Sequence, residues 1–274
     1  MTDITLNEFF SFKRHPFAET YRLQKPFLPK RDEQILRAAR SLLHVGKSFA
    51  LCGPSGAGKS TFLRHLIQQM DQRHFQPYVI PYGGYNRGAI HRLIAEQMGV
   101  DPGGRRVPLL HRLQHQLRQL AEIQQAKHPI FVFDDAQLLE PATLLDLCAL
   151  MAGSENTVAA SVILVADPTF PKMLSLRVMA PIQSRLTSIF HIQHLTQDEC
   201  ACFLTHRLTA AGASPDLFEP EAVELMAAET TGNRRHLMNM ATMLLQEAHG
   251  RGEQTVSAQL VLDTQSAQPL PMEN

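Results

Sequence analysis

The chain has 274 residues, a length that accommodates one full α/β domain with a smaller second domain. Its 26 lysine and arginine residues are balanced by 26 aspartate and glutamate residues, so overall charge neither supports nor excludes a nucleic-acid partner, and such binding needs a local basic stripe. Four cysteines without paired spacing predict reduced thiols in a cytoplasmic protein, and no apolar run approaches the roughly 18 residues of a membrane span.

Residues 1–30 form an N-terminal segment rich in aromatic, proline and basic residues. The segment is too apolar for a mobile tail and too rich in proline for a helix, so we expect it to pack on the core of the following domain. Asp32 is a suitable N-cap for a helix that ends near Gly46, and this helix leads into an apolar run at 48–52 that predicts a buried strand.

A P-loop motif follows this first strand and continues into an apolar helix. Its glycines let the backbone present N–H groups to phosphate, Lys59 reaches the β- and γ-phosphates, and the Ser60 hydroxyl ligates Mg²⁺. The sequence therefore predicts that a nucleoside triphosphate is bound together with Mg²⁺. The residues predicted to bind the nucleotide here are Gly53, Pro54, Ser55, Gly56, Ala57, Gly58, Lys59, Ser60 and Thr61.

The next stretch contains a second strand at 77–80, a glycine-rich loop at 82–88 and a helix at 89–98. Tyr85, Asn86 and Arg87 give the loop exposed aromatic and basic side chains, so it is able to wrap a ligand. A basic turn at 101–106, which includes Arg105 and Arg106, precedes an amphipathic helix over 108–125.

A third apolar strand, at 130–133, ends in two acids, Asp134 and Asp135. By itself this pattern is weak, because strands commonly end in aspartate. Its place two αβ units after a P-loop makes it strong, since Asp134 is then expected to hold the Mg²⁺ shell and Asp135 to polarise the attacking water.

After a helix at 141–151, a buried strand at 162–165 ends at Asp167, and Arg185 precedes a fifth strand at 189–192. The carboxyl ends of parallel strands line a ligand crevice, so Asp167 is placed to sense the γ-phosphate or the water; the alternative is a turn-forming aspartate before Pro168. Strands alternating with helices predict a doubly wound, parallel, five-stranded sheet in an α/β fold.

From Thr196 onward the pattern is helical throughout. Arg234 and Arg235 stand at a helix start, where cations oppose the helix dipole, so we expect an anionic partner there. The predicted domains are an N-terminal segment at 1–30, a nucleotide-binding domain at 31–194, a helical lid at 195–263 and a disordered tail at 264–274.

The motif order resembles the AAA+ ATPases of the ExeA/GspA-like group over residues 9–262. The motifs are Phe12-Lys13-Arg14-His15-Pro16-Phe17, the P-loop, Phe133-Asp134-Asp135-Ala136-Gln137, Val165-Ala166-Asp167-Pro168, Gln183-Ser184-Arg185-Leu186 and Gly232-Asn233-Arg234-Arg235. That group includes secretion ATPases and, similar to them, transposition regulators related to MuB, TniB and TnsC. The secretion members carry a membrane segment and a periplasmic extension that are not found in this sequence, so the resemblance favours the transposition branch.

The resemblance implies a role for each matching position. Asp134 stands at the Walker B acid, Asp135 at the catalytic glutamate, Asp167 at sensor 1, Arg185 at the arginine finger and Arg235, which also contacts the nucleotide, at sensor 2. Asp135 is shorter than the usual glutamate, and Asp167 replaces a neutral residue. Misplacement of about 1 Å can cost on the order of 10²-fold in rate, so we expect slow hydrolysis.

The resemblance also implies that ATP joins subunits into a ring or filament on double-stranded DNA, with self-association creating the active sites. Tyr85, Asn86, Arg87, Arg105 and Arg106 are then the expected contacts to DNA phosphates, and a solvated basic loop is the alternative. The implied function is an ATP-dependent transposition regulator that selects target sites and recruits a transposase. A cytoplasmic secretion or pilus assembly ATPase is the alternative, and a STAND-like switch, for which no sensor domain is found, ranks third.

Overall fold

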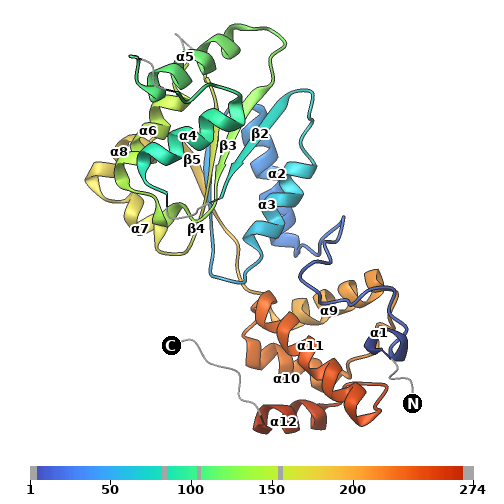
Figure 1. Ribbon diagram of the computed structural model, residues 1–274. Helices are drawn as coiled ribbons and strands as arrows, with labels where there is room; N and C mark the ends of the chain where they lie inside the picture. Colours follow the sequence, from blue (N-terminus) through green and yellow to red (C-terminus); the bar gives the residue numbers. More distant parts are fainter. Residues whose placement is uncertain (1–4, 82–84, 104–105, 154–156, 268–274) are drawn as a thin grey trace. The chain divides into compact units, whose positions relative to one another are not determined.

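The computed structural model describes residues 5–81, 85–103, 106–153 and 157–267 (Figure 1). The chain divides into two compact units. The sheet unit comprises Lys30–Pro54 and Lys59–Ile192, and the helical unit comprises Met1–Pro29, Ser55–Gly58 and Gln193–Asn274. No helix among the described ranges is both long and apolar enough to cross a membrane.

The sheet unit is built on a five-stranded sheet with the order β2-β3-β4-β1-β5, in which every pair of neighbouring strands is parallel. The connection after β1 runs toward β2, whereas the connection after its neighbour β4 runs the other way, to β5, so the direction of the connections switches between these two strands. Ligands of such sheets bind at this switch point, at the carboxyl ends of the strands. The strands are β1 Ser48–Cys52, β2 Phe75–Ile80, β3 His128–Phe133, β4 Ser161–Ala166 and β5 Leu186–His191.

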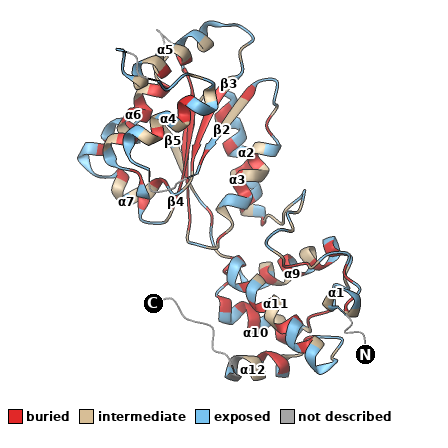
Figure 2. Cartoon of the chain, in the orientation of Figure 1, coloured by how far each residue is buried: buried red, intermediate tan, exposed pale blue. Residues whose placement is uncertain are grey.

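Helices cover both faces of this sheet, with α2 and α3 on one side and α4, α5 and α6 on the other (Figure 1). This arrangement explains why β1 and β4 are buried along their whole length (Figure 2). The helices of the unit are α2 Lys30–His44, α3 Lys59–Gln68, α4 Arg87–Met98, α5 Leu109–Glu122, α6 Pro141–Met151, α7 Phe170–Leu174 and α8 Ala180–Gln183, with 3₁₀ turns η1 Ala136–Leu138 and η2 Arg177–Met179.

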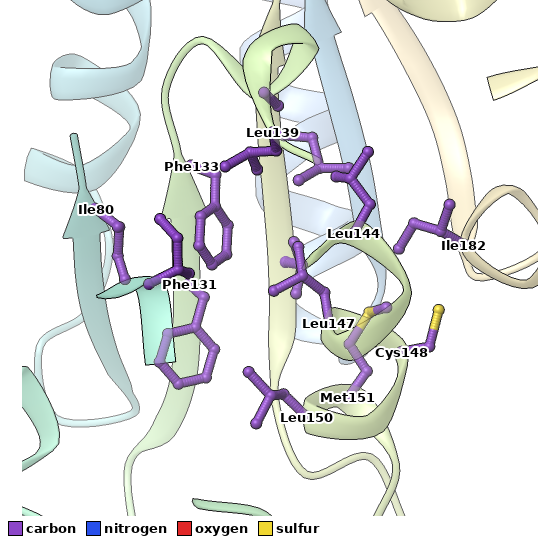
Figure 3. Close-up of a cluster of buried hydrophobic side chains, with 14 of the residues drawn as sticks. Ile80, Phe131, Phe133, Leu139, Leu144, Leu147, Cys148, Leu150, Met151 and Ile182 are labelled. Carbon is purple, nitrogen blue, oxygen red and sulfur yellow. The ribbon is translucent and has the colours of Figure 1, made fainter. Parts of the chain in front are cut away.

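A buried apolar cluster joins α6 to the sheet (Figure 3). Phe131 and Phe133 lie on one face of β3, because alternate residues of a strand share a face, and they belong to the same cluster as Leu144 and Leu147 of α6. Truncating such a phenylalanine to alanine costs about 3–5 kcal/mol. This packing fixes the strand whose carboxyl end carries the two acids.

The helical unit has its own core, made by α9 Gln197–Ala211, α10 Pro220–Thr230, α11 Arg234–Arg251 and α12 Ala258–Ala267. The predicted capping box is present at the start of α9, where Thr196 and Glu199 bond reciprocally. The helix α12 continues to Ala267, so the prediction of disorder from residue 264 is wrong for 264–267, and residues 268–274 lie outside the described ranges.

The N-terminal segment differs from the sequence-based expectation. We expected it on the nucleotide-binding domain, but Phe10, Phe12 and Phe17 are buried in the core of the helical unit. The backbone N–H of Lys13 donates to Ala211 O at 2.9 Å, and Arg207 Nε donates to Pro16 O at 2.6 Å. The physical reason is that the apolar faces of the C-terminal helices leave a surface that these aromatic rings cover. The segment also contains a short helix, α1 Leu6–Phe9.

Candidate active site

The P-loop connects β1 to α3 and depends on glycine at three positions. Gly56 and Gly58 have φ values of +72° and +96°, in the left-handed region that favours glycine. A side chain at Gly53 collides with the backbone oxygen of Ile192, and one at Gly56 collides with the Asn233 side chain. The loop can therefore adopt this conformation only with glycine at these places.

Three carbonyl groups of the P-loop are held by the helical unit, to which Ser55–Gly58 belong. Asn233 Nδ2 donates to Ser55 O at 3.1 Å, the Arg234 N–H donates to Gly56 O at 3.1 Å, and the Arg234 guanidinium donates to Ala57 O. Because C=O and N–H point in opposite directions across a trans peptide, the N–H groups that follow these carbonyls face the other way. Such a row of N–H groups forms an anion-binding concavity.

Lys59, the first residue of α3, supplies the positive charge of the loop. Its Nζ donates to Gly53 O at 2.7 Å and to Pro54 O at 3.0 Å. Burial lowers the pKa of Lys59, while the charges of Asp134, Asp135 and Asp167 raise it. A half-buried ammonium group facing three carboxylates is suited to holding an anion together with a metal cation.

Two acids follow β3 in different environments. Asp134 is half-buried, and burial is the largest cause of its raised pKa, opposed by the hydrogen bond that its Oδ1 accepts from the Asp135 N–H at 3.1 Å. Asp135 is exposed and has φ +50° and ψ +43°, in the left-handed region that few residues other than glycine adopt. The Asp135 carboxylate is therefore open to solvent, whereas that of Asp134 is partly covered.

Asp167 follows β4, the neighbour of β3, so it lies at the same edge of the sheet. Its Oδ1 accepts hydrogen bonds from the Thr169 N–H at 2.8 Å and from Thr169 Oγ1 at 2.6 Å. This is the turn-forming aspartate that the sequence left open as the alternative. A role for Asp167 at sensor 1 stays a prediction.

The two predicted arginines lie in different units. Arg185 is exposed just before β5, and its Nη1 donates to Pro181 O at 2.9 Å. Arg235 Nη1 donates to Ser55 Oγ at 3.2 Å, which places this cation beside the P-loop within the helical unit. The guanidinium of the neighbouring Arg234 donates to the backbone oxygen of Ala57 in the loop. This cation therefore has a partner within the chain, whereas the sequence led us to expect an anionic ligand.

The predicted DNA contacts separate in the structure. Asn86 is the N-cap of α4, where its side chain accepts from the Ala89 N–H, and Arg87 forms a two-point ion pair with Asp146 at 2.5 and 2.7 Å. Tyr85 and Arg106 are exposed, and Arg105 lies outside the described residues. The side chains of Asn86 and Arg87 therefore have partners within the chain although both residues are exposed, and the choice between a DNA contact and a solvated loop stays a prediction.

Sequence reasoning missed the hydrogen bonds that two side chains make at predicted site residues, those of Asn233 and Gln137. Asn233 contacts the P-loop and also caps α11, because its Oδ1 accepts from the Arg235 and His236 N–H groups. Asparagine directly before a helical run is an N-cap signal, which marks the position but not its second partner. Gln137 forms hydrogen bonds with Asp135 after β3 and with Asp167 after β4, and no local sequence pattern predicts these bonds.

The donors present fit a magnesium ion bound together with nucleotide phosphates. Within the ranges that the structure describes, no group of three or more His, Cys, Asp or Glu residues is arranged to hold a metal. Magnesium commonly takes one or two protein oxygens and leaves its other positions to water and phosphate, so the Ser60 hydroxyl and the Asp134 carboxylate are suitable ligands. Burial raises the pKa of the nearby Cys52 thiol to about 11, so it stays protonated and is not a nucleophile.

Comparisons with known proteins agree with this fold and this motif. A family model described as an AAA domain matches residues 43–174. General secretion pathway protein A of Aeromonas hydrophila is 23% identical over 252 residues, which cover 91% of this chain and 46% of that protein. This chain therefore spans less than half the length of that relative.

Solved structures of other proteins have the same fold. Cdc6p from Pyrobaculum aerophilum superposes with a TM-score of 0.72 and 19% identity, covering 94% of this chain and 72% of that one. The Aeropyrum pernix ORC1 protein in complex with DNA gives a TM-score of 0.66 and 18% identity, covering 92% and 68%. The fold is that of an AAA+ P-loop nucleoside triphosphatase, with a five-stranded parallel sheet and a helical C-terminal region.

Proposed function

We propose that this protein binds ATP with Mg²⁺ and hydrolyses it to ADP and phosphate. The observation that carries the proposal is that Lys59, the P-loop lysine, faces the acids that follow β3 and β4. Nucleotide binding is supported by a neighbour of the same fold, the Aeropyrum pernix ORC2 protein, whose structure holds ADPNP and ADP. The charges around Lys59 support hydrolysis.

Each side chain has a defined task in this proposal. Lys59 and the loop N–H groups bind the β- and γ-phosphates, while Ser60 and Asp134 hold Mg²⁺, which neutralises charge on the phosphates. Asp135 orients the attacking water and accepts its proton. Arg235 contacts the nucleotide, and Arg185 stabilises the transferred phosphoryl group bound by a neighbouring subunit.

Nucleotide binding and phosphate release test this function. In Lys59→Ala, we expect affinity for a fluorescent ATP analogue to fall at least tenfold and Mg²⁺-dependent phosphate release to disappear. Lys47→Ala is the matched control, because Lys47 is an exposed lysine just before β1. If the Lys59→Ala variant binds and hydrolyses ATP as well as the Lys47→Ala variant, the proposal is wrong.

For the biological process, the comparisons favour an ATPase that assists the assembly of a secretion or pilus system, whose partner is a protein. The supporting relative is General secretion pathway protein A, which matches 91% of this chain. The secretion candidate therefore ranks first, whereas the sequence alone ranks the transposition regulator first. Because only 46% of that relative is matched, the missing membrane segment does not separate the two branches.

The second candidate is an ATP-dependent regulator of transposition that assembles on double-stranded DNA and recruits a transposase. A neighbour of the same fold is bound to DNA, which supports this possibility. Among the predicted contacts, Tyr85 and Arg106 are the exposed ones that the structure describes, so they are the better candidates for binding phosphates.

Electron microscopy with ATP, with and without duplex DNA, separates the two candidates. Filaments or rings that require DNA support the transposition candidate, and their salt dependence should weaken in Arg106→Ala but not in Arg177→Ala, another exposed arginine of the sheet unit. ATP-dependent assemblies that are the same with and without DNA support the secretion candidate.

A further inference from the structure

Gln137 links the ends of two neighbouring strands at the candidate active site. Its Nε2 donates to Asp135 Oδ1 at 3.2 Å, and its Oε1 accepts the backbone N–H of Asp167 at 3.1 Å. Gln137 lies in the 3₁₀ turn that follows β3, and Asp167 follows β4. One side-chain amide therefore spans the edge of the sheet from the candidate catalytic acid to the neighbouring strand.

The orientation of this amide is determined by its partners. A backbone N–H can only donate, so the atom facing Asp167 must be the amide oxygen. The amide nitrogen then faces Asp135, whose carboxylate can only accept when ionised. Both bonds are satisfied in this orientation and neither in the flipped one, so Gln137 presents a donor to the acid.

The hydrogen bond from Gln137 restrains a carboxylate that lies at the protein surface. The residue is exposed, and its backbone is in the left-handed region, with φ +50°. An exposed carboxylate samples several rotamers, and in this short side chain a displacement of about 1 Å costs on the order of 10²-fold in rate. The hydrogen bond from Gln137 selects one carboxylate position.

We propose that Gln137 is a positioning residue, which holds Asp135 toward the attacking water and ties that position to the end of β4. The inference rests on the ATPase function proposed above. Gln137 takes no proton and touches no substrate; it acts through Asp135. Movement of the residues after β4 then changes the orientation of the Asp135 carboxylate. The position of that strand end therefore affects the rate of hydrolysis.

Two substitutions distinguish a residue that positions Asp135 from one that only stabilises the end of β4. Gln137→Glu is nearly isosteric and keeps an oxygen for the Asp167 N–H, but it replaces the donor to Asp135 with a negative charge. Gln137→Ala removes both bonds. The matched control is Gln97→Ala, since Gln97 is another glutamine of the sheet unit and donates to Val79 O, away from the acids.

The measurement is steady-state phosphate release over a range of ATP concentrations, with binding of a non-hydrolysable ATP analogue and thermal melting. We expect kcat to fall on the order of 10-fold to 10²-fold in both Gln137 variants, with KM and analogue affinity within about threefold of wild type. Gln137→Glu should be no more active than Gln137→Ala, and Gln97→Ala should match wild type.

Three results overturn the inference. The first is wild-type kcat in Gln137→Glu with a defect in Gln137→Ala, which means that the side chain only braces β4. The second is a defect in KM or analogue affinity at unchanged kcat. The third is a wild-type protein that binds ATP without hydrolysing it, which also overturns the proposed function; the first two leave that function intact.

Discussion

At the scale of single residues, the P-loop glycines set the clearest constraint on nucleotide binding. Gly56 combines a left-handed backbone with direct contact to the Asn233 side chain, so both conformation and space exclude a Cβ atom. Gly99, at the end of α4, has a similar φ of +69°, but a Cβ atom added there meets no described atom within 4 Å. A comparison of substitutions at these two glycines therefore distinguishes the effect of backbone strain alone from the effect of strain combined with a steric collision.

We predict that Gly56→Ala lowers affinity for ATP at least tenfold, because the loop must shift to relieve the collision. Gly99→Ala should lose about 1–2 kcal/mol of stability through left-handed strain alone and keep wild-type affinity. Titration with a fluorescent ATP analogue, together with thermal melting, measures both effects. Equal affinity in the two variants contradicts the assignment of Gly56 to the binding loop.

Residue-level prediction from sequence succeeded where a motif fixes local geometry. The P-loop and the strand before it occupy the predicted positions, and Asp134 and Asp135 follow β3. The sequence did not predict the ion pair of Arg87, because its partner Asp146 is 59 positions away in sequence. The bond from Asn233 to Ser55 spans 178 positions, and no local pattern encodes it.

At the scale of elements, β5 shows why strand boundaries were harder to predict than strand order. The sequence suggested residues 189–192, whereas β5 is Leu186–His191 and pairs with β1 from Ser48. Its residues are half-buried or exposed, as expected for an edge strand, so hydrophobicity alone does not mark its start. The short helices α7 and α8 were missed for a related reason, since four or five residues carry too little periodicity.

At the same scale, His128 at the start of β3 makes the sheet unit sensitive to acid. Burial lowers the pKa of His128 below its ordinary value of 6.5, and its Nε2 lies 2.8 Å from Ser161 Oγ. Below pH 6.5 the unfolded chain takes up a proton that the folded protein still excludes, so stability falls as pH falls toward the folded pKa.

We therefore predict that His128→Gln melts with a weaker pH dependence than wild type between pH 7.5 and 5.5. Lowering the pKa of a group by one on folding corresponds to about 1.4 kcal/mol, which is roughly 2–4 °C in Tm for a domain of this size. His111→Gln is the control, because His111 is exposed on α5. Identical pH slopes in wild type and His128→Gln contradict the role of burial.

At the scale of the whole molecule, hydrolysis is proposed to depend on assembly. Arg185 is exposed, as an arginine that acts on a neighbouring subunit must be. The fold could be predicted from the alternation of strands and helices, but the packing of residues 10–17 in the helical unit could not, because the bond from Arg207 to Pro16 spans 191 positions in sequence. Assembly itself depends on surfaces that hydrophobic periodicity does not describe.

A mixing experiment tests the action of Arg185 between subunits. Lys59→Ala retains Arg185 without a working P-loop, and Arg185→Ala retains the P-loop without the arginine. Each variant alone should lose at least about 10²-fold in rate, and an equal mixture should recover roughly a quarter of the wild-type rate if subunits pair at random head to tail. Wild-type activity in Arg185→Ala alone, or no recovery on mixing, contradicts an arginine finger in trans.

The most direct test of the central claim is the rate of Mg²⁺-dependent phosphate release by wild type and Asp135→Asn, with ATP binding measured in parallel. We predict slow release by wild type, below about one per second, because the aspartate is one methylene shorter than a glutamate. Asp135→Asn should bind ATP normally and release phosphate at least about 10²-fold more slowly. Equal rates for the two proteins, or a wild-type turnover of tens per second without a partner, would contradict the account.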